Sequence, residues 1–252
     1  MELIAHRGSA YEAPENSLAA IELAVRQGAT RIEIDAWLTA DGQVVICHDD
    51  TTKRCTDRDL VVASSTAAEL AAAKMTNGEG IPTLHQVCEL IAGRARLDLE
   101  LKDQRPELVG PALAVLAAHG MLTDSLITAF GEASLKACRS AGFRGDLGLL
   151  IGSESLALRQ RAFEAWPFAA IERTGASSLA IHHRLAHPLL RRELRRRGLG
   201  LYLWMSMKDE HAPEPQRAAR YKAAAQMGAK GLIVGRIPEV RSCLDAAGFR
   251  TW

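Results

Sequence analysis

The alternation of short apolar runs with longer amphipathic segments is the feature that most restricts how this chain can fold. Nine runs have the length and composition of β-strands: 3–6, 31–38, 44–48, 95–102, 125–130, 147–152, 177–183, 199–205 and 231–235. Helix-like segments, several of which end on glycine, lie between them at 17–28, 106–120, 132–142, 187–198 and 214–228. Strands that alternate with helices predict a parallel sheet with crossover helices.

The number of these units predicts a closed α/β barrel. The runs 31–38 and 44–48 lie close together and are expected to form one β-hairpin, which leaves eight strand–helix units in 252 residues. This number and length fit a (β/α)₈ TIM barrel, as one domain over 1–252. The irregular stretch at about 49–82 predicts a short insertion in the rim after the hairpin. A doubly wound open sheet is the alternative, but no GxGxxG turn follows the first strand.

Charge and cysteine content exclude several classes of protein. Lys and Arg number 31 against 30 Asp and Glu, which argues against a nucleic-acid-binding protein. Five scattered cysteines without a CxxC pair favour reduced thiols, and therefore a cytoplasmic protein, over a disulfide framework or a zinc site. No apolar run is long enough to span a membrane, and Met1 leads almost directly into a strand, so we expect no signal peptide. The sequence carries no signal for an oligomeric state.

Acidic residues interrupt two of the predicted strands. Glu33 and Asp35 are two residues apart, so in a strand they face the same side, and Glu100 shares a face with Asp98 and Lys102 in the same way. Inward-facing residues at the carboxyl ends of barrel strands form the mouth in which active sites lie. Burying several carboxylates there without a compensating positive charge would be very costly.

Two kinds of compensation remain open. In the first, Arg7 and Lys102 neutralise the acids in a purely structural ion-pair layer. In the second, Glu33, Asp35 and Glu100 bind a cation, and their hard oxygen ligands suit Mg²⁺, Ca²⁺ or Mn²⁺ better than zinc.

Histidines end two of the early strand runs. His6 closes the first run and His48 closes the hairpin, so both side chains are expected at the same mouth. A single histidine there would be typical of a hydrogen-bonded structural residue. Two beside a carboxylate cluster indicate a general acid and a general base near neutral pH. His182 and His183 end the run at 177–183, and one of them is expected to line the pocket.

These candidates belong to an ordered set of motifs that covers roughly the first 100 residues. The set consists of His6-Arg7-Gly8, Pro14-Glu15-Asn16-Ser17, Glu33-x-Asp35, Thr39-x-Asp41-Gly42, His48-Asp49, Arg54-x-Thr56, Ile81-Pro82-Thr83-Leu84 and Leu99-Glu100-Leu101-Lys102. In this order the motifs closely resemble the glycerophosphodiester phosphodiesterase family. Later in the chain, Trp204 and the GLIVGRIP run are looser matches.

The resemblance implies a TIM-barrel phosphoric diester hydrolase that converts glycerophosphodiesters to an alcohol and glycerol 3-phosphate with a divalent cation. Its small-molecule substrate would be attacked either by water or by a hydroxyl group of the substrate itself. The roles it implies, position by position, are metal binding by Glu33, Asp35 and Glu100, acid–base catalysis by His6 and His48, phosphate binding by Arg7 and Lys102, and substrate contacts by Glu15 and Trp204. Glu15 would support His6 or a glycerol hydroxyl, or else the start of a helix at Ser17.

Two departures from the family pattern concern the rim. Trp204 is followed by Met205-Ser206-Met207 where the family usually has a Thr-Val-Asn-like run. The eighth strand leads into Val234-Gly235-Arg236-Ile237-Pro238, which lacks the aspartate of the usual Thr-Asp-x-Pro. Both lie where the alcohol or glycerol part would bind. A lysophospholipase D-type enzyme, a sugar-phosphodiester phosphodiesterase and a non-catalytic phosphate-ester-binding barrel therefore remain alternatives.

Overall fold

The computed structural model describes residues 1–152 and 166–252. Its strands form one sheet in the order β1-β9-β8-β7-β6-β5-β4-β2-β3, and β1 also pairs with β2. Because β1 and β2 pair in parallel, eight parallel strands close into a barrel, while β3 pairs antiparallel with β2 outside the ring. The predicted (β/α)₈ barrel and its hairpin are confirmed.

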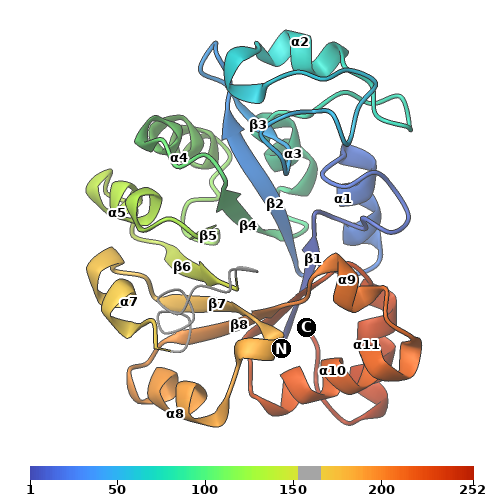
Figure 1. Ribbon diagram of the computed structural model, residues 1–252, viewed down its shortest axis with the longest axis vertical. Coiled ribbons are helices and arrows are strands. Elements are labelled where there is room, and N and C mark those ends of the chain that lie inside the picture. The colour runs from blue at the N-terminus through green and yellow to red at the C-terminus, as the bar shows by residue number, and fades with distance from the viewer. Residues whose placement is uncertain (153–165) are drawn as a thin grey trace.

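The elements follow the predicted alternation, with helices around the outside of the barrel (Figure 1). The strands are β1 Glu2–His6, β2 Arg31–Leu38, β3 Val44–Ile46, β4 Arg96–Leu101, β5 Leu126–Ala129, β6 Asp146–Ile151, β7 Ser178–His182, β8 Gly200–Trp204 and β9 Gly231–Val234. The helices are α1 Leu18–Arg26, α2 Ala67–Ala72, α3 Leu84–Ile91, α4 Val109–Ala118, α5 Glu132–Ser140, α7 Phe168–Thr174, α8 Pro188–Arg196, α9 Met207–Glu210, α10 Glu214–Gln226 and α11 Ile237–Ala246. Single 3₁₀ turns occur at Val62–Ser64, Pro106–Leu108 and His183–Leu185.

Side chains alternate along each strand between an outer core, under the helices, and the interior of the barrel. In β2, Ile32 and Ile34 pack outward against the helices, so Glu33 and Asp35 point the other way, into the barrel. Deeper in the interior lies a small apolar cluster of Ile4, Leu126, Leu150, Ala180, Tyr202 and Ile233. The strand register places Glu33 beside His6 on β1 and Asp35 beside Glu100 on β4. Side-chain parity and register together therefore collect the acids in one place.

Residues 49–82 form a compact insertion beside the β2–β3 hairpin, at the top of Figure 1. Its apolar side chains meet those of the hairpin in a separate cluster of Val45, Cys47, Val62, Leu70, Met75 and Ile81. Helix α2 begins at a capping box in which Thr66 and Glu69 exchange hydrogen bonds. The insertion is thus packed against the strand that leads to His48.

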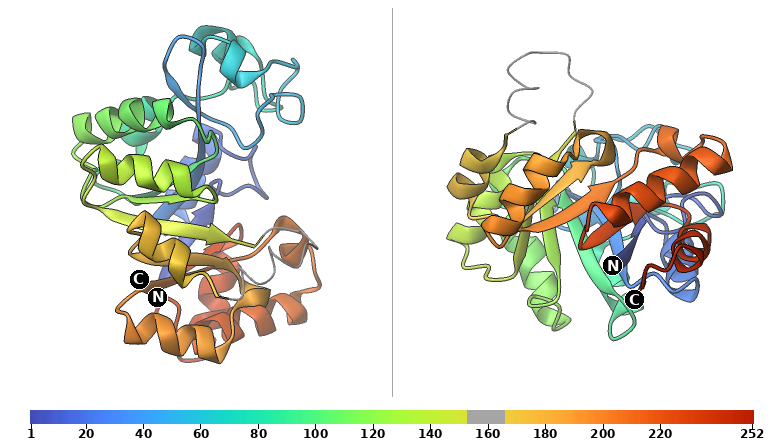
Figure 2. Two further views of the ribbon diagram at one scale, coloured as in Figure 1. Left: turned by 60° about the vertical axis from the view of Figure 1, so that its left-hand side comes forward. Right: turned by 90° about the horizontal axis from the view of Figure 1, so that it is seen from below.

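The two chain ends lie side by side (Figure 2). The amino group of Met1 donates to the carbonyl of Arg250 at 2.9 Å, and the Trp252 amide donates to the Met1 carbonyl at 3.3 Å. Since β1 starts at residue 2, both ends lie at the amino-terminal end of the barrel strands, opposite the mouth. No helix among the described residues has the length and apolar content needed to cross a membrane.

Candidate active site

A cavity of about 170 Å³ opens at the carboxyl ends of the barrel strands. The predicted site residues that line it are His6, Arg7, Glu33, His48, Glu100, Lys102 and Trp204. Two other predicted residues lie behind this surface: Asp35 is completely buried, and Glu15 is largely enclosed between two arginines. The structure therefore brings the candidates from β1, β2, β4, β8 and the hairpin to one mouth.

A tight turn after β1 positions Arg7. Arg7 and Asn16 have φ values of 56° and 60°, in the left-handed region that side-chain-bearing residues seldom adopt. Gly8 has a φ of 77°, and a Cβ there would lie 2.6 Å from the backbone of Ala20. The turn directs the Arg7 amide to Glu33 Oε2 at 3.0 Å. Asn16 donates from Nδ2 to Asp35 Oδ2 at 2.8 Å. Asn16 is therefore a residue of the site, although its position in the sequence predicted no role for it.

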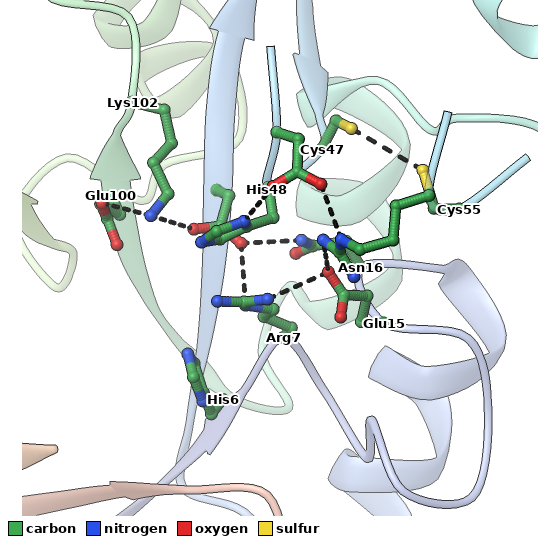
Figure 3. A network of polar contacts seen from close by, with 12 residues as sticks. His6, Arg7, Glu15, Asn16, Cys47, His48, Cys55, Glu100 and Lys102 are labelled. Carbon is green, nitrogen blue, oxygen red and sulfur yellow. Dashed lines mark hydrogen bonds and ion pairs between the residues drawn. The ribbon is translucent and has the colours of Figure 1, made fainter. Parts of the chain in front are cut away.

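The three predicted metal-binding acids converge. Glu33, Asp35 and Glu100 each offer an oxygen, and the three atoms lie within 4.8 Å of one another. Lys102 Nζ lies 2.7 Å from Glu100 and 3.2 Å from Asp35, and Arg7 Nε lies 3.3 Å from Asp35. Ion pairing, the first of the two sequence-based alternatives, is therefore present at Asp35 and Glu100, and Figure 3 draws the contact between Lys102 and Glu100.

Ion pairing leaves the cluster short of positive charge. Two cationic side chains face three carboxylates, and within the described residues Glu33 meets no Lys or Arg side chain, with His6 Nε2 at 3.9 Å. Burial, together with repulsion from Asp35 and Glu100, raises the pKa of Glu33 well above its usual range. Burial likewise raises the pKa of Glu100 to about 7, although Lys102 opposes the shift.

A divalent cation fits this donor set. All three donors are carboxylate oxygens, which hard cations prefer. Asp35 Oδ1 and Glu100 Oε1 are buried, with Lys102 Nζ at 3.2 Å and 2.7 Å but no well-aligned hydrogen bond from the described residues. Each carboxylate oxygen has two lone pairs, so acceptor capacity remains beside Lys102. Lys102 and Arg7 hold the pKa of Asp35 well below its usual range despite complete burial, so this ligand stays ionised. Charge, chemistry and free acceptor capacity all allow one further positive ion.

A chain of hydrogen bonds holds His48. Its Nδ1 lies 2.6 Å from Asp49 Oδ1, and Arg54 Nε donates to the other oxygen of Asp49 at 2.6 Å. Arg54 also donates to the carboxylate of Glu15. Glu15 accepts a second hydrogen bond from Arg7 (Figure 3). Since the Asp49 carboxylate accepts from Nδ1–H, the Nε2 atom is left for proton exchange. Burial lowers the pKa of His48, so its imidazole is neutral near pH 7.

The His6 side chain is more deeply buried than that of His48. Its Nδ1 is buried and has no hydrogen-bond partner among the described residues. Burial and the neighbouring Arg7 charge lower the pKa of His6 to about 3. Both mouth histidines are therefore neutral near pH 7, the form in which an imidazole accepts a proton.

Glu15 does not contact His6, contrary to one expectation. Its carboxylate binds Arg7 at 3.0 Å and Arg54 at 2.7 Å. Helix α1 is capped by Ser17, whose hydroxyl accepts from the Ala20 amide at 3.1 Å. A contact between Glu15 and a glycerol hydroxyl stays a prediction.

Aromatic side chains form one wall of the cavity. Trp204 donates from Nε1 to the Ile151 carbonyl at 3.0 Å, which fixes its ring. The ring meets Phe130 edge-on, with centroids 6.5 Å apart. Phe130 lines the cavity and is 43% exposed, although the sequence analysis did not single it out. Its place just after β5 was the available signal.

The expectation that His182 or His183 lines this pocket is wrong. Neither is among the described residues around the cavity. Their Nε2 atoms lie 2.9 Å and 3.3 Å from the Asp209 carboxylate, and the His182 ring packs edge-on against the Trp204 ring, with centroids 4.5 Å apart. Asp209 also caps α9 and pairs with Arg220, so this cluster braces the rim.

The two departures from the family pattern also lie at this rim. Ser206 and Met207, which follow Trp204, line the cavity. After β9, where the usual aspartate is missing, the Gly235 amide donates to the carboxylate of Glu210 at 2.8 Å. Burial raises the pKa of Glu210 to about 7.

This shift predicts that Glu210 makes stability depend on pH. Between its ordinary pKa of 4.5 and about 7, the unfolded carboxyl is ionised while the folded one keeps its proton. Unfolding then releases a proton, so rising pH destabilises the fold in this window. Urea unfolding of wild type and Glu210→Gln should show the wild type losing stability relative to the variant from about pH 5 to about pH 8. A constant difference would show that Glu210 ionises normally.

The fold and the site together are those of a TIM-barrel enzyme. Two neutral imidazoles, two fixed cations and a carboxylate cluster share one cavity at the catalytic end of the barrel. Comparison with known proteins identifies the family. Residues 6–239 match the model of the glycerophosphoryl diester phosphodiesterase family. The chain belongs to this family and is a phosphoric diester hydrolase.

Individual relatives agree with this assignment. A glycerophosphodiester phosphodiesterase of Caldanaerobacter subterraneus subsp. tengcongensis is 32% identical over 182 residues, 66% of this chain and 75% of that protein. The structure of an Oleispira antarctica phosphodiesterase in complex with the product sn-glycerol-3-phosphate is 26% identical, with a TM-score of 0.80 and 97% of each chain covered. A Silicibacter pomeroyi structure, 22% identical over 99% of this chain and 94% of its own, shares the fold with a TM-score of 0.85.

Proposed function

We propose that this enzyme hydrolyses glycerophosphodiesters to an alcohol and glycerol 3-phosphate, using a divalent cation and acid–base catalysis by His6 and His48. The observation that carries the proposal is the single cavity lined by both imidazoles, both cations and two of the three clustered acids. The Oleispira antarctica relative, whose structure contains sn-glycerol-3-phosphate, supports the choice of product.

The residues of the mouth supply what phosphodiester hydrolysis requires. Arg7 and Lys102 place positive charge beside the non-bridging oxygens, where negative charge grows in the transition state. One neutral imidazole takes the proton of the attacking hydroxyl as its oxygen bonds to phosphorus. The other must take up a proton when the anionic substrate binds beside it, and as the P–O bond breaks it gives that proton to the departing alcohol oxygen.

Glu33, Asp35 and Glu100 would hold the cation, with Mg²⁺ or Ca²⁺ as the first choices and Mn²⁺ as the third. Such an ion supplies Lewis-acid charge for the phosphate oxygens. Trp204 and Phe130 offer an apolar wall for the carbon skeleton of the substrate.

A substrate panel tests this proposal. Glycerophosphocholine, glycerophosphoethanolamine, a lysophospholipid and a sugar phosphodiester would each be incubated with Mg²⁺, Ca²⁺ or Mn²⁺, and the phosphate products identified by mass spectrometry. We expect glycerol 3-phosphate from the first two. Preferred release of lysophosphatidic acid or of a sugar phosphate would support the alternative enzymes instead. A cyclic glycerol phosphate would identify a substrate hydroxyl as the nucleophile.

Lys102→Met separates phosphate binding from organisation of the acids. If Lys102 acts on the transition state, kcat/KM should fall by about 10²–10³-fold. Cation affinity should stay unchanged or rise slightly, because a positive neighbour 2.7 Å from Glu100 is removed. Calorimetric titration with Mg²⁺ or Ca²⁺ measures the affinity, and Lys136→Met, at an exposed pair on α5, is the matched control. Collapse of both activity and cation binding would assign Lys102 to the structural ion-pair layer.

A further inference from the structure

We propose that Cys47 and Cys55 are a peroxide-sensitive dithiol whose disulfide slows the enzyme, an effect on turnover that rests on the proposed function. The two Sγ atoms lie 3.9 Å apart, although the residues are eight positions apart and form no CxxC motif (Figure 3). Cys47 directly precedes His48, and Cys55 directly follows Arg54. Both thiols are free in the structure.

The two sulfurs differ in the way that a reactive and a resolving cysteine do. Cys47 is buried in the apolar cluster of the insertion, whereas Cys55 is partly exposed. The contact with the Cys47 sulfur and the Arg54 charge lower the pKa of Cys55, although burial opposes the shift. The pKa of Cys47 is raised by the same contact and by burial. Cys55 is therefore the sulfur that meets an oxidant first.

The oxidant we propose is a hydroperoxide. The Cys55 thiolate attacks the outer oxygen, the O–O bond breaks, and the alkoxide or hydroxide that leaves takes up a proton. The Cys47 sulfur then attacks the sulfur of the Cys55 sulfenic acid. The S–O bond breaks, and the hydroxyl leaves as water with the Cys47 proton. Two thiols are oxidised by two electrons to one disulfide, and the peroxide is reduced.

Bond formation should disturb the support of His48. The sulfurs must approach from 3.9 Å to about 2.05 Å. Cys47 is anchored, because its amide donates to the Asp35 carbonyl at 2.9 Å and its side chain is packed. The movement therefore falls on Cys55 and on the adjoining Arg54.

Arg54 joins Asp49 to Glu15, so its displacement releases the carboxylate that orients His48. Arg54 is in this sense a positioning residue. Because proton transfer depends on the orientation of the imidazole, oxidation should lower kcat by about 10–100-fold and change KM much less.

The experiment compares wild type, Cys55→Ser and Cys243→Ser in Mg²⁺, before and after hydrogen peroxide and again after dithiothreitol. Cys243 is a partly exposed cysteine far along the chain and serves as the matched control. Intact mass, peptide mapping and free-thiol counts report the disulfide, and steady-state kinetics report kcat and KM. We expect a Cys47–Cys55 disulfide and a reversible loss of kcat in wild type and Cys243→Ser, with neither in Cys55→Ser.

The separate readouts make each failure distinct. Oxidation that stops at a sulfenic or sulfinic acid, or that joins other cysteines, would overturn the dithiol. A Cys47–Cys55 disulfide with unchanged kcat would overturn the effect on turnover. If reduced wild type fails to hydrolyse any phosphodiester, the proposed function fails, while the mass of the oxidised protein still decides whether the disulfide forms.

Discussion

Replacing His48 with alanine should lower kcat by about 10²–10⁴-fold and leave thermal unfolding nearly unchanged. The imidazole lies at the barrel mouth and contributes nothing to either of the two barrel cores. Its Nδ1 is fixed by Asp49 at 2.6 Å, so the variant removes one oriented proton carrier and little else. His6→Ala should have an effect of similar size, since the two imidazoles serve opposite ends of the same displacement.

Steady-state kinetics on glycerophosphocholine at saturating cation would measure this loss, with a thermal melt to check the fold. His119→Ala changes a partly exposed histidine that is paired with His85 on the outside of the barrel, and it is the matched control. Nearly full activity in either His6→Ala or His48→Ala would remove that residue from the acid–base pair.

Glu33→Gln should abolish most activity and yet raise the melting temperature of the metal-free protein. The pKa of Glu33 is raised because burial and two neighbouring carboxylates disfavour its charge. Each kcal/mol relieved is worth about 2–4 °C in a domain of this size. An acid with a raised pKa costs stability where the unfolded chain has already released its proton, so the gain should be larger at about pH 8 than at about pH 5.

The same melts, repeated with Mg²⁺ or Ca²⁺, should reverse the order. Cation that binds only the folded state stabilises wild type progressively as its concentration rises, and Glu33→Gln should respond much less. Glu22→Gln, which removes the acid shared by two surface ion pairs, is the control and should show no such reversal. A Glu33→Gln variant that melts below wild type in chelator would indicate that Glu33 is structurally satisfied without metal.

The barrel and its clustered acids could be predicted from two features of the sequence, the alternation of side chains along each strand and the position of residues at strand ends. Alternation in 31–38 sends Ile32 and Ile34 outward and Glu33 and Asp35 inward, and this parity does not depend on distant parts of the chain. His6 could be placed at the mouth in the same way, because it is the last residue of a barrel strand. These residues could therefore be placed together before any coordinates were known.

Contacts that depend on loop paths could not be predicted. Asn16 reaches Asp35 because the turn after β1 adopts left-handed backbone angles at Arg7 and Asn16, which no sequence spacing specifies. His182 ends its strand as His6 does, but Asp209, from the helix after the next strand, draws it away from the cavity. Such partners become visible only when the chain is folded.

The proximity of Cys47 and Cys55 has the same origin. The segment between them begins the insertion and brings the two sulfurs to 3.9 Å, whereas their separation in sequence matches no disulfide or metal motif. The contact between the Gly235 amide and the Glu210 carboxylate likewise joins residues that are far apart in sequence. In both cases the sequence shows which residues are present, and the fold decides which of them meet.

Restoration of activity to chelator-treated wild type tests whether catalysis depends on a cation bound by Glu33, Asp35 and Glu100. Glycerol 3-phosphate release from a glycerophosphodiester would be followed after exhaustive chelation and then after stepwise addition of Mg²⁺, Ca²⁺ or Mn²⁺, with Glu33→Gln in parallel. We expect no measurable release without cation, saturable recovery in wild type, and recovery in Glu33→Gln only at much higher concentration or not at all. Full activity in chelator, unchanged by added cation, would contradict cation dependence and leave the carboxylates as a structural ion-pair layer.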